Sequence, residues 1–165
     1  MPTPQRYSVV VAKDYLKFAA AHFIAYRGFR EPLHGHNYQV CVRVEAELGA
    51  DGYVLDFGLV KRAAKALCEE LDERVLVPAE SDCLAVAVDD ARVEMTTAEG
   101  DRFAFPRRDC AVLPIVHSSA EELAAYLLAR LRAVLADEAG GRGIAALEVG
   151  VAEAPGQIAY CRETC

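Results

Sequence analysis

Apolar and polar residues alternate over several stretches of the chain, a pattern typical of β-strands that bury one face. The clearest stretch is 38–48, and a turn with a glycine at each end follows it at 49–52. Apolar, partly β-branched runs precede it, and a hairpin around Pro155-Gly156 lies near the end of the chain. The strands predicted from these patterns cover residues 7–12, 16–24, 38–48, 146–153 and 158–162.

Two segments instead repeat their apolar residues at helical spacing. The first predicted helix opens at Asp56 and runs to about residue 71. The second runs from about 120 to 137, with Ser118 or Ser119 as its cap, and Ser118-Ser-Ala-Glu121 fits the capping-box pattern. Between the helices, short strands are expected at 84–88, 93–97 and 103–105, and their role is left open.

The order of strands, helix, small strands, helix and strands predicts an α+β fold. We expect a single domain, 1–165, in which an antiparallel sheet carries two helices on one face. The edge strands of such a sheet need a partner or a cover. Pairing of edges between subunits would make the protein a homo-oligomer.

Composition narrows the class of protein. The chain of 165 residues is 53% hydrophobic and 26% charged, with a net charge of −7, which argues against nucleic-acid binding. No apolar run approaches the roughly 20 residues that span a membrane, and the first residues lack a signal-peptide core, so a cytoplasmic location is expected. Six scattered cysteines without a Cys-x-x-Cys pair are expected to be reduced and mostly buried.

Three of the four histidines, His22, His34 and His36, lie within fifteen residues. Alternate side chains of a strand point to one face, so His34 and His36 would project side by side, with His22 on a neighbouring strand. Gly35 between them allows a close approach. Three imidazoles and one open position describe a catalytic zinc site, although imidazoles also suit copper, iron and nickel.

Several motifs together resemble the 6-pyruvoyl-tetrahydropterin synthase family, which includes 6-carboxy-tetrahydropterin synthase. The resemblance runs nearly end to end and implies a tunnelling fold, with three subunits in a barrel and two barrels stacked as a hexamer. It also implies that His22, His34 and His36 hold Zn²⁺. The motifs are Phe18-Ala-Ala-Ala-His22, His34-Gly-His-Asn-Tyr38, Val54-Leu-Asp-Phe57, Leu71-Asp72, Ser119-Ala-Glu-Glu-Leu-Ala124, Val151-Ala-Glu153 and Ala159-Tyr160.

The resemblance further implies a pterin site between subunits, anchored by Glu153 and including Ser119. A pterin presents its 2-amino group and its N3–H as adjacent donors, and one carboxylate can accept both. The expected partner is therefore a small pterin, with no nucleic acid and no membrane. Without the resemblance, Glu153 would be read as a solvated turn residue.

Two positions depart from the synthase pattern. The synthases carry a cysteine four residues before the first histidine of His-Gly-His, where this chain has Arg30, and they carry Leu-Asp-His where this chain has Leu71-Asp72-Glu73. Another branch of the family has Glu-x-x-His-Gly-His, which Glu31 matches. That branch resembles an aldolase-like lyase that converts dihydroneopterin triphosphate to 6-hydroxymethyl-7,8-dihydropterin.

The sequence therefore predicts a zinc-dependent pterin lyase in which Glu31 transfers a proton beside the metal. Asp72 is a second catalytic candidate. His117 is a third, which would supply an imidazole from another direction, or it is merely a helix-entry residue. Two alternatives stay open: a pyruvoyl- or carboxy-pterin synthase with a replaced proton relay, and an inactive pterin- or metal-binding protein.

Overall fold

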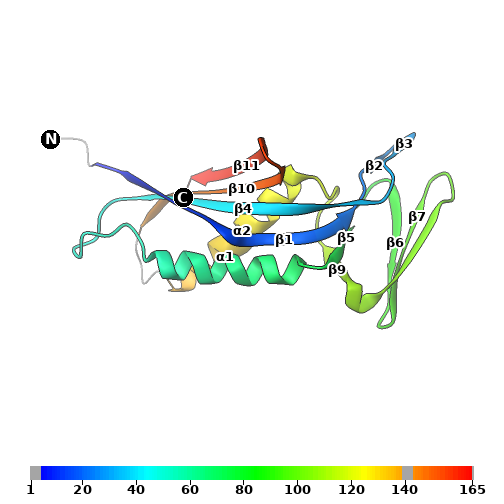
Figure 1. Cartoon of the computed structure of the whole chain (residues 1–165), viewed down its shortest axis with the longest axis horizontal. Helices are drawn as coiled ribbons and strands as arrows, with labels where there is room; N and C mark the ends of the chain where they lie inside the picture. The colour runs from blue at the N-terminus through cyan, green and yellow to red at the C-terminus, as the bar shows by residue number, and fades with distance from the viewer. Residues whose placement is uncertain (1–4, 139–142, 165) are drawn as a thin grey trace.

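A six-stranded sheet forms the centre of the computed structural model, which describes residues 5–138 and 143–164 (Figure 1). The strands lie in the order β11-β10-β4-β1-β5-β9. The α+β class and the two helices predicted from the sequence are confirmed. The strands of this sheet are β1 (Tyr7–His22), β4 (His34–Ala46), β5 (Arg74–Pro78), β9 (Cys110–Leu113), β10 (Ile144–Ala154) and β11 (Gln157–Thr164).

The sheet is mixed. Strands β1, β4, β10 and β11 pair antiparallel, as predicted, whereas β5 runs parallel to β1 and β9 runs parallel to β5. The sequence pattern did not indicate β5 and β9. They are short, and β5 ends in a run of three buried residues that lacks the alternation of a half-exposed strand.

The two strands predicted at 7–12 and 16–24 are a single strand, β1. Its register against β4 shifts between Ala12, which pairs with Cys41, and Lys17, which pairs with Gln39. Five steps along β1 (12 to 17) thus correspond to two along β4 (41 to 39), and a β-bulge absorbs the difference. The polar residues of the bulge, Lys13 and Asp14, gave the impression of a break between two strands.

Both helices, α1 (Phe57–Leu71) and α2 (Ala120–Glu138), cover the same face of the sheet (Figure 1). Asp56 caps α1 by accepting a hydrogen bond from Gly58 N at 2.7 Å, so the predicted start is confirmed. The main core lies between helices and sheet, where the rings of Phe18 and Tyr38 stack 4.7 Å apart. No helix within 5–138 or 143–164 is long and apolar enough to cross a membrane.

A second, three-stranded sheet lies at one end of the molecule, and we call it the accessory sheet (Figure 1). It consists of β6 (Leu84–Val88), β7 (Arg92–Thr97) and β8 (Arg102–Pro106), close to the predicted ranges. A short hairpin of β2 (Ala25–Tyr26) and β3 (Phe29–Arg30) follows β1, and the 3-10 helix η1 (Arg107–Asp109) follows β8. A separate apolar cluster joins Phe23 and Ala25 to the accessory sheet.

Candidate metal centre

The three histidines of the sequence motif converge where β1 ends and β4 begins. His22 and His34 are direct partners in the antiparallel pairing of the two strands, and His36 lies two residues further along β4. One potential ligand atom of each imidazole lies within 4.8 Å of those of the other two. The cluster continues the row of Phe18 and Ala20 along β1, and it therefore occupies the face of the sheet that the helices cover.

Hydrogen bonds fix which ring nitrogens are free to bind a metal. His22 Nδ1 lies 2.8 Å from the carbonyl oxygen of Ser118, and His34 Nδ1 lies 2.9 Å from that of Pro32. A carbonyl can only accept, so each Nδ1 carries the hydrogen and each Nε2 keeps its lone pair. Such a contact to the outer nitrogen is the usual way in which proteins orient metal-binding histidines.

The arrangement fits a bound ion. His22 Nε2 is buried and finds no hydrogen-bond partner in the part of the chain that the structure describes, and an unsatisfied buried group costs about 1–3 kcal/mol. His34 Nε2 and His36 Nε2 are 3.1 Å apart. Two nitrogens bound to one tetrahedral zinc at 2.0–2.1 Å would be separated by about 3.3 Å. The residues can therefore hold a tetrahedral metal ion and leave one position open.

Burial of the His22 ring lowers its pKa, and the hydrogen bond to the Ser118 carbonyl only partly opposes this effect. The positive forms of His34 and His36 lower the pKa further. His22 thus stays neutral to a lower pH than a free imidazole does. Because only the neutral ring binds a metal, the environment keeps this ligand available under mildly acidic conditions.

Gly35 allows the two strands to meet closely at the cluster. A Cβ atom at this position would lie 3.1 Å from the carbonyl oxygen of Ala20, a backbone atom that cannot easily move away. Any side chain here would push β4 from β1 and separate His34 from His22. The close packing between the strands therefore favours glycine in His-Gly-His.

Glu31 lies close to the cluster and is held in place. Its carboxylate accepts a hydrogen bond from Ile24 N at 2.9 Å, and its own N–H donates to the Ile24 carbonyl at 2.9 Å. The charge of Glu31 raises the pKa of Tyr38 and opposes the lowering at His22. Glu31 thus lies close enough to His22 for its charge to act on that ring, and its catalytic role stays a prediction.

Glu153 approaches the same region from β10. It lies at a register shift between β10 and β11, is half-buried, and makes no hydrogen bond or ion pair with any described residue. Burial raises the pKa of Tyr38, and the Glu153 charge adds to this effect. The Tyr38 ring is 5.4 Å from that of His36 and 5.9 Å from that of His22, between centroids. An unpaired carboxylate thus lies near the histidine cluster.

Asp72 has a structural contact. Its exposed carboxylate follows the last residue of α1 and accepts a hydrogen bond from Ala19 N at 2.7 Å, which ties the end of the helix to β1. Asp72 does not join the three-histidine cluster. Its catalytic role stays a prediction, and the observed contact accounts for a carboxylate at this position without it.

Ser118 and Ser119 make different contacts at the start of α2. Ser119 Oγ accepts a hydrogen bond from Glu122 N at 3.3 Å, so the capping pair lies one residue later than the predicted Ser118–Glu121. Ser118 is buried and holds His22. The role of Ser119 in substrate binding stays a prediction. His117 makes no hydrogen bond or ion pair within the described chain and lies outside the histidine cluster, and its catalytic role stays a prediction.

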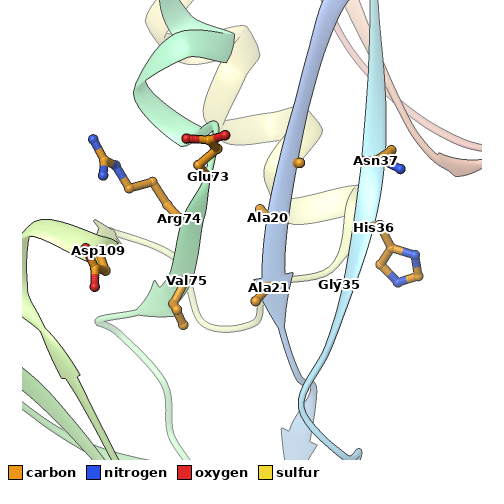
Figure 2. A pocket seen from close by; sticks show the side chains of 10 residues that line it. Ala20, Ala21, Gly35, His36, Asn37, Glu73, Arg74, Val75 and Asp109 are labelled. Carbon is orange, nitrogen blue, oxygen red and sulfur yellow. The ribbon is translucent and has the colours of Figure 1, made fainter.

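Glu73, which stands where the synthases have a histidine, lines a cavity that His36 also lines. Its backbone has φ 56°, a left-handed value that is uncommon outside glycine. With Arg74 and Asp109 it lines an open cavity of about 540 Å³ (Figure 2). The ring of His36 points away from these three side chains (Figure 2). Glu73 does not join the three-histidine cluster, although it lines the same cavity as His36.

Two contacts of the site were not predicted from the sequence. Ser118 supports His22 through a backbone carbonyl, which no side-chain pattern can indicate. Arg30 contacts Glu31 and the accessory sheet, and neither contact was predicted. Both contacts join segments that lie far apart in the sequence or depend on the backbone.

Comparisons with known proteins point to one family. The sequence model of a family described as 6-pyruvoyl tetrahydropterin synthase matches residues 11–164. A protein of Methanocaldococcus jannaschii, provisionally named a 6-carboxy-5,6,7,8-tetrahydropterin synthase, is 30% identical over 149 residues, which cover 90% of each chain. The crystal structure of 6-pyruvoyl tetrahydropterin synthase from Plasmodium vivax is 36% identical, covers 98% of this chain and 99% of its own, and gives a TM-score of 0.92.

Two further findings concern the chemistry of relatives. In two variant structures of the Plasmodium vivax enzyme, a catalytic glutamate is replaced by alanine or by cysteine. A shorter match of 59 residues, 41% identical, covers 36% of this chain and 50% of the dihydroneopterin monophosphate aldolase of Pyrococcus furiosus.

The candidate metal centre predicts how metal content depends on each histidine. We expect His34→Ala and His36→Ala to purify with little bound transition metal, because two imidazoles and water form a much weaker site than three imidazoles. His117→Ala is the matched control and should keep the metal content of the wild type. Elemental analysis of the purified variants measures this directly, and full occupancy in both ligand variants would contradict the assignment.

Proposed function

The chain belongs to the 6-pyruvoyl tetrahydropterin synthase family, and from this we propose that it is a zinc-dependent lyase that cleaves the side chain of a dihydroneopterin phosphate. The product would be 6-hydroxymethyl-7,8-dihydropterin. The observation that carries the proposal is Glu31, held by Ile24 beside three converging imidazoles. Arg30 stands where a synthase would have its cysteine.

Two relatives support this choice. A glutamate is the catalytic residue of the Plasmodium vivax enzyme, whose fold matches this chain over nearly its whole length. The aldolase of Pyrococcus furiosus, which resembles part of this chain, acts on dihydroneopterin monophosphate. A catalytic glutamate and an aldolase of dihydroneopterin monophosphate therefore both occur among the similar proteins. The number of phosphates on the substrate of this chain is left open.

The reaction transfers a proton as a carbon–carbon bond of the side chain breaks. The hydroxyl that becomes the aldehyde loses a proton, and the carbon that stays on the pterin ring gains one. The Ile24 N–H holds one oxygen of Glu31, and the second oxygen can take up and return this proton. His22, His34 and His36 would hold zinc, which supplies Lewis-acid polarisation of the side-chain hydroxyls.

Glu153 is proposed to anchor the pterin ring. Its half-buried carboxylate has no partner among the described residues and lies near Tyr38, beside the histidines. A carboxylate that accepts both adjacent donors of a pterin selects the ring by geometry as well as by charge. Ser119, at the start of α2 and next to Ser118, is proposed to contact the substrate from the other side.

A synthase reaction is the second candidate, because the relatives that cover most of the chain are named as synthases. In that case Asp72 or His117 would replace the missing relay.

For either reaction we propose that the chain works in the cytoplasm as a trimer or hexamer. The edge strand β11 is paired on one side only within the chain, and an exposed strand edge is a surface for pairing.

The products of the reaction test the proposal. The zinc-loaded protein is incubated with dihydroneopterin triphosphate, and in parallel with the monophosphate, and the pterins formed are identified by mass. We expect 6-hydroxymethyl-7,8-dihydropterin. A pyruvoyl product would establish the synthase alternative, and unchanged substrate in both reactions would indicate a binding protein without activity.

Replacing Glu31 by glutamine tests the proton transfer. The amide keeps the size of the side chain but cannot take up the proton, so kcat should fall about 10²–10⁴-fold. Zinc content and pterin affinity should stay near those of the wild type. Glu47→Gln, at an exposed position after β4, is the control. If Glu31→Gln turns over normally while Asp72→Asn or His117→Ala is inactive, the proton transfer belongs to one of those residues.

Replacing Glu153 by glutamine tests the anchor. One acceptor becomes a donor that faces the donors of the pterin, and a mismatch of this kind costs about 1–3 kcal/mol in binding. A fluorescence titration with a pterin should show weaker binding at unchanged zinc content. Glu148→Gln, on the same strand, removes an ion pair with Arg43 and serves as the matched control. Equal affinities of Glu153→Gln and wild type would place Glu153 outside the site.

A further inference from the structure

The guanidinium group of Arg30 joins two separate parts of the molecule. Its Nε donates to Asp101 Oδ2 at 3.0 Å, and its Nη2 lies 2.9 Å from the same oxygen in an ion pair. Its Nη1 donates to the backbone carbonyl of Glu31 at 2.9 Å. Asp101 lies in the turn between β7 and β8 of the accessory sheet, 71 residues further along the chain. Arg30 thus connects this sheet to the residue proposed to transfer the proton.

Two aromatic rings hold the same group. The central carbon of the Arg30 guanidinium lies 5.2 Å from the ring centroid of Phe103 and 5.9 Å from that of Phe23. The two rings contact each other at 4.7 Å between centroids and belong to the apolar cluster beneath the accessory sheet. Only 29% of the Arg30 side chain is exposed. Hydrogen bonds along its edge and the contact with these two rings therefore leave the guanidinium little freedom to move.

The support behind Arg30 is itself fixed. Asp101 N donates to Thr97 Oγ1 at 3.1 Å, and Thr97 N donates to the Asp101 carbonyl at 3.0 Å. Thr97 is buried. Asp101, which Arg30 contacts, thus lies in a short turn that is closed by hydrogen bonds to the buried Thr97.

We propose that Arg30 is a positioning residue, which fixes the backbone of Glu31 against the accessory sheet while Ile24 fixes its carboxylate. The proposal rests on the proposed role of Glu31 in proton transfer. A lysine cannot replace Arg30, because a single ammonium group cannot contact both Asp101 and the Glu31 carbonyl while it lies over the rings of Phe103 and Phe23. The accessory sheet thereby gains a role as the rigid support of a catalytic loop.

The experiment compares Arg30→Lys and Arg30→Met with the wild type. Lysine keeps the positive charge and methionine keeps much of the apolar stem, so that one variant should fold if the other does not. Arg102→Lys is the matched control, because Arg102 lies next to Asp101 but makes only an exposed ion pair with Glu94. Zinc content is measured for each protein.

The first measurement is hydrogen exchange of the segment 24–31, which needs no activity. Loss of the Arg30 contacts should speed exchange of the Glu31 and Ile24 amides by tenfold or more, with the amides of β1 and β4 unchanged. The control should exchange like the wild type. Unchanged exchange in both Arg30 variants would overturn the proposal.

The second measurement separates kcat from KM on the dihydroneopterin phosphate. A displaced catalytic group should lower kcat by about 10–100-fold while KM changes less than twofold. In a Glu31→Gln background the same Arg30 substitutions should cause no further loss, because the group they position is already gone. An additive loss in the double variant, or faster exchange without any change in kcat, would overturn the positioning role.

The two proposals fail in different ways. If the wild type forms no hydroxymethylpterin, or if Glu31→Gln keeps full activity, the proposed function fails. The exchange measurement then still decides whether Arg30 holds the segment 24–31. If Glu31→Gln is inactive and Arg30→Lys is fully active, the function stands and the inference about Arg30 is wrong.

Discussion

The antiparallel pairing that sets His22 directly opposite His34 is the constraint on which the rest of the site depends. Because of this pairing, residues 23–33 must connect the end of β1 to the start of β4, which lie next to each other. The chain meets this requirement with the β2–β3 hairpin, which brings Glu31 back beside Ile24, only two residues from His22. The position of the candidate proton carrier thus follows from the geometry of the connection between two ligand-bearing strands.

Much of this site could be predicted from the sequence, because its ligands lie on one hairpin. The period of two along a strand places His34 and His36 on one face, and their proximity in sequence to His22 indicates a common cluster. The start of α1 could be predicted from Asp56 for a similar reason, since the cap and the amide that it binds are two residues apart. Contacts between residues that lie close together in the sequence can therefore be predicted from its pattern.

Other features depend on contacts that no local pattern encodes. Strand β5 ends in buried residues and lies parallel to β1 after a crossover through α1, so it shows no simple alternation. Ser118 meets His22 across 96 residues through a carbonyl, and Arg30 meets Asp101 across 71. These contacts depend on how the sheet, α2 and the accessory sheet pack together, and the chemistry of the single residues does not reveal them.

The buried, unpartnered Nε2 of His22 has a consequence for the abundance of the folded protein. An ion that binds the folded chain and not the unfolded one stabilises the fold by mass action, by about 2.7 kcal/mol when its free concentration is one hundred times the Kd. Metal supply would then govern not only turnover but also how much of the chain survives proteolysis. A shortage of the ion would then lower the amount of folded protein.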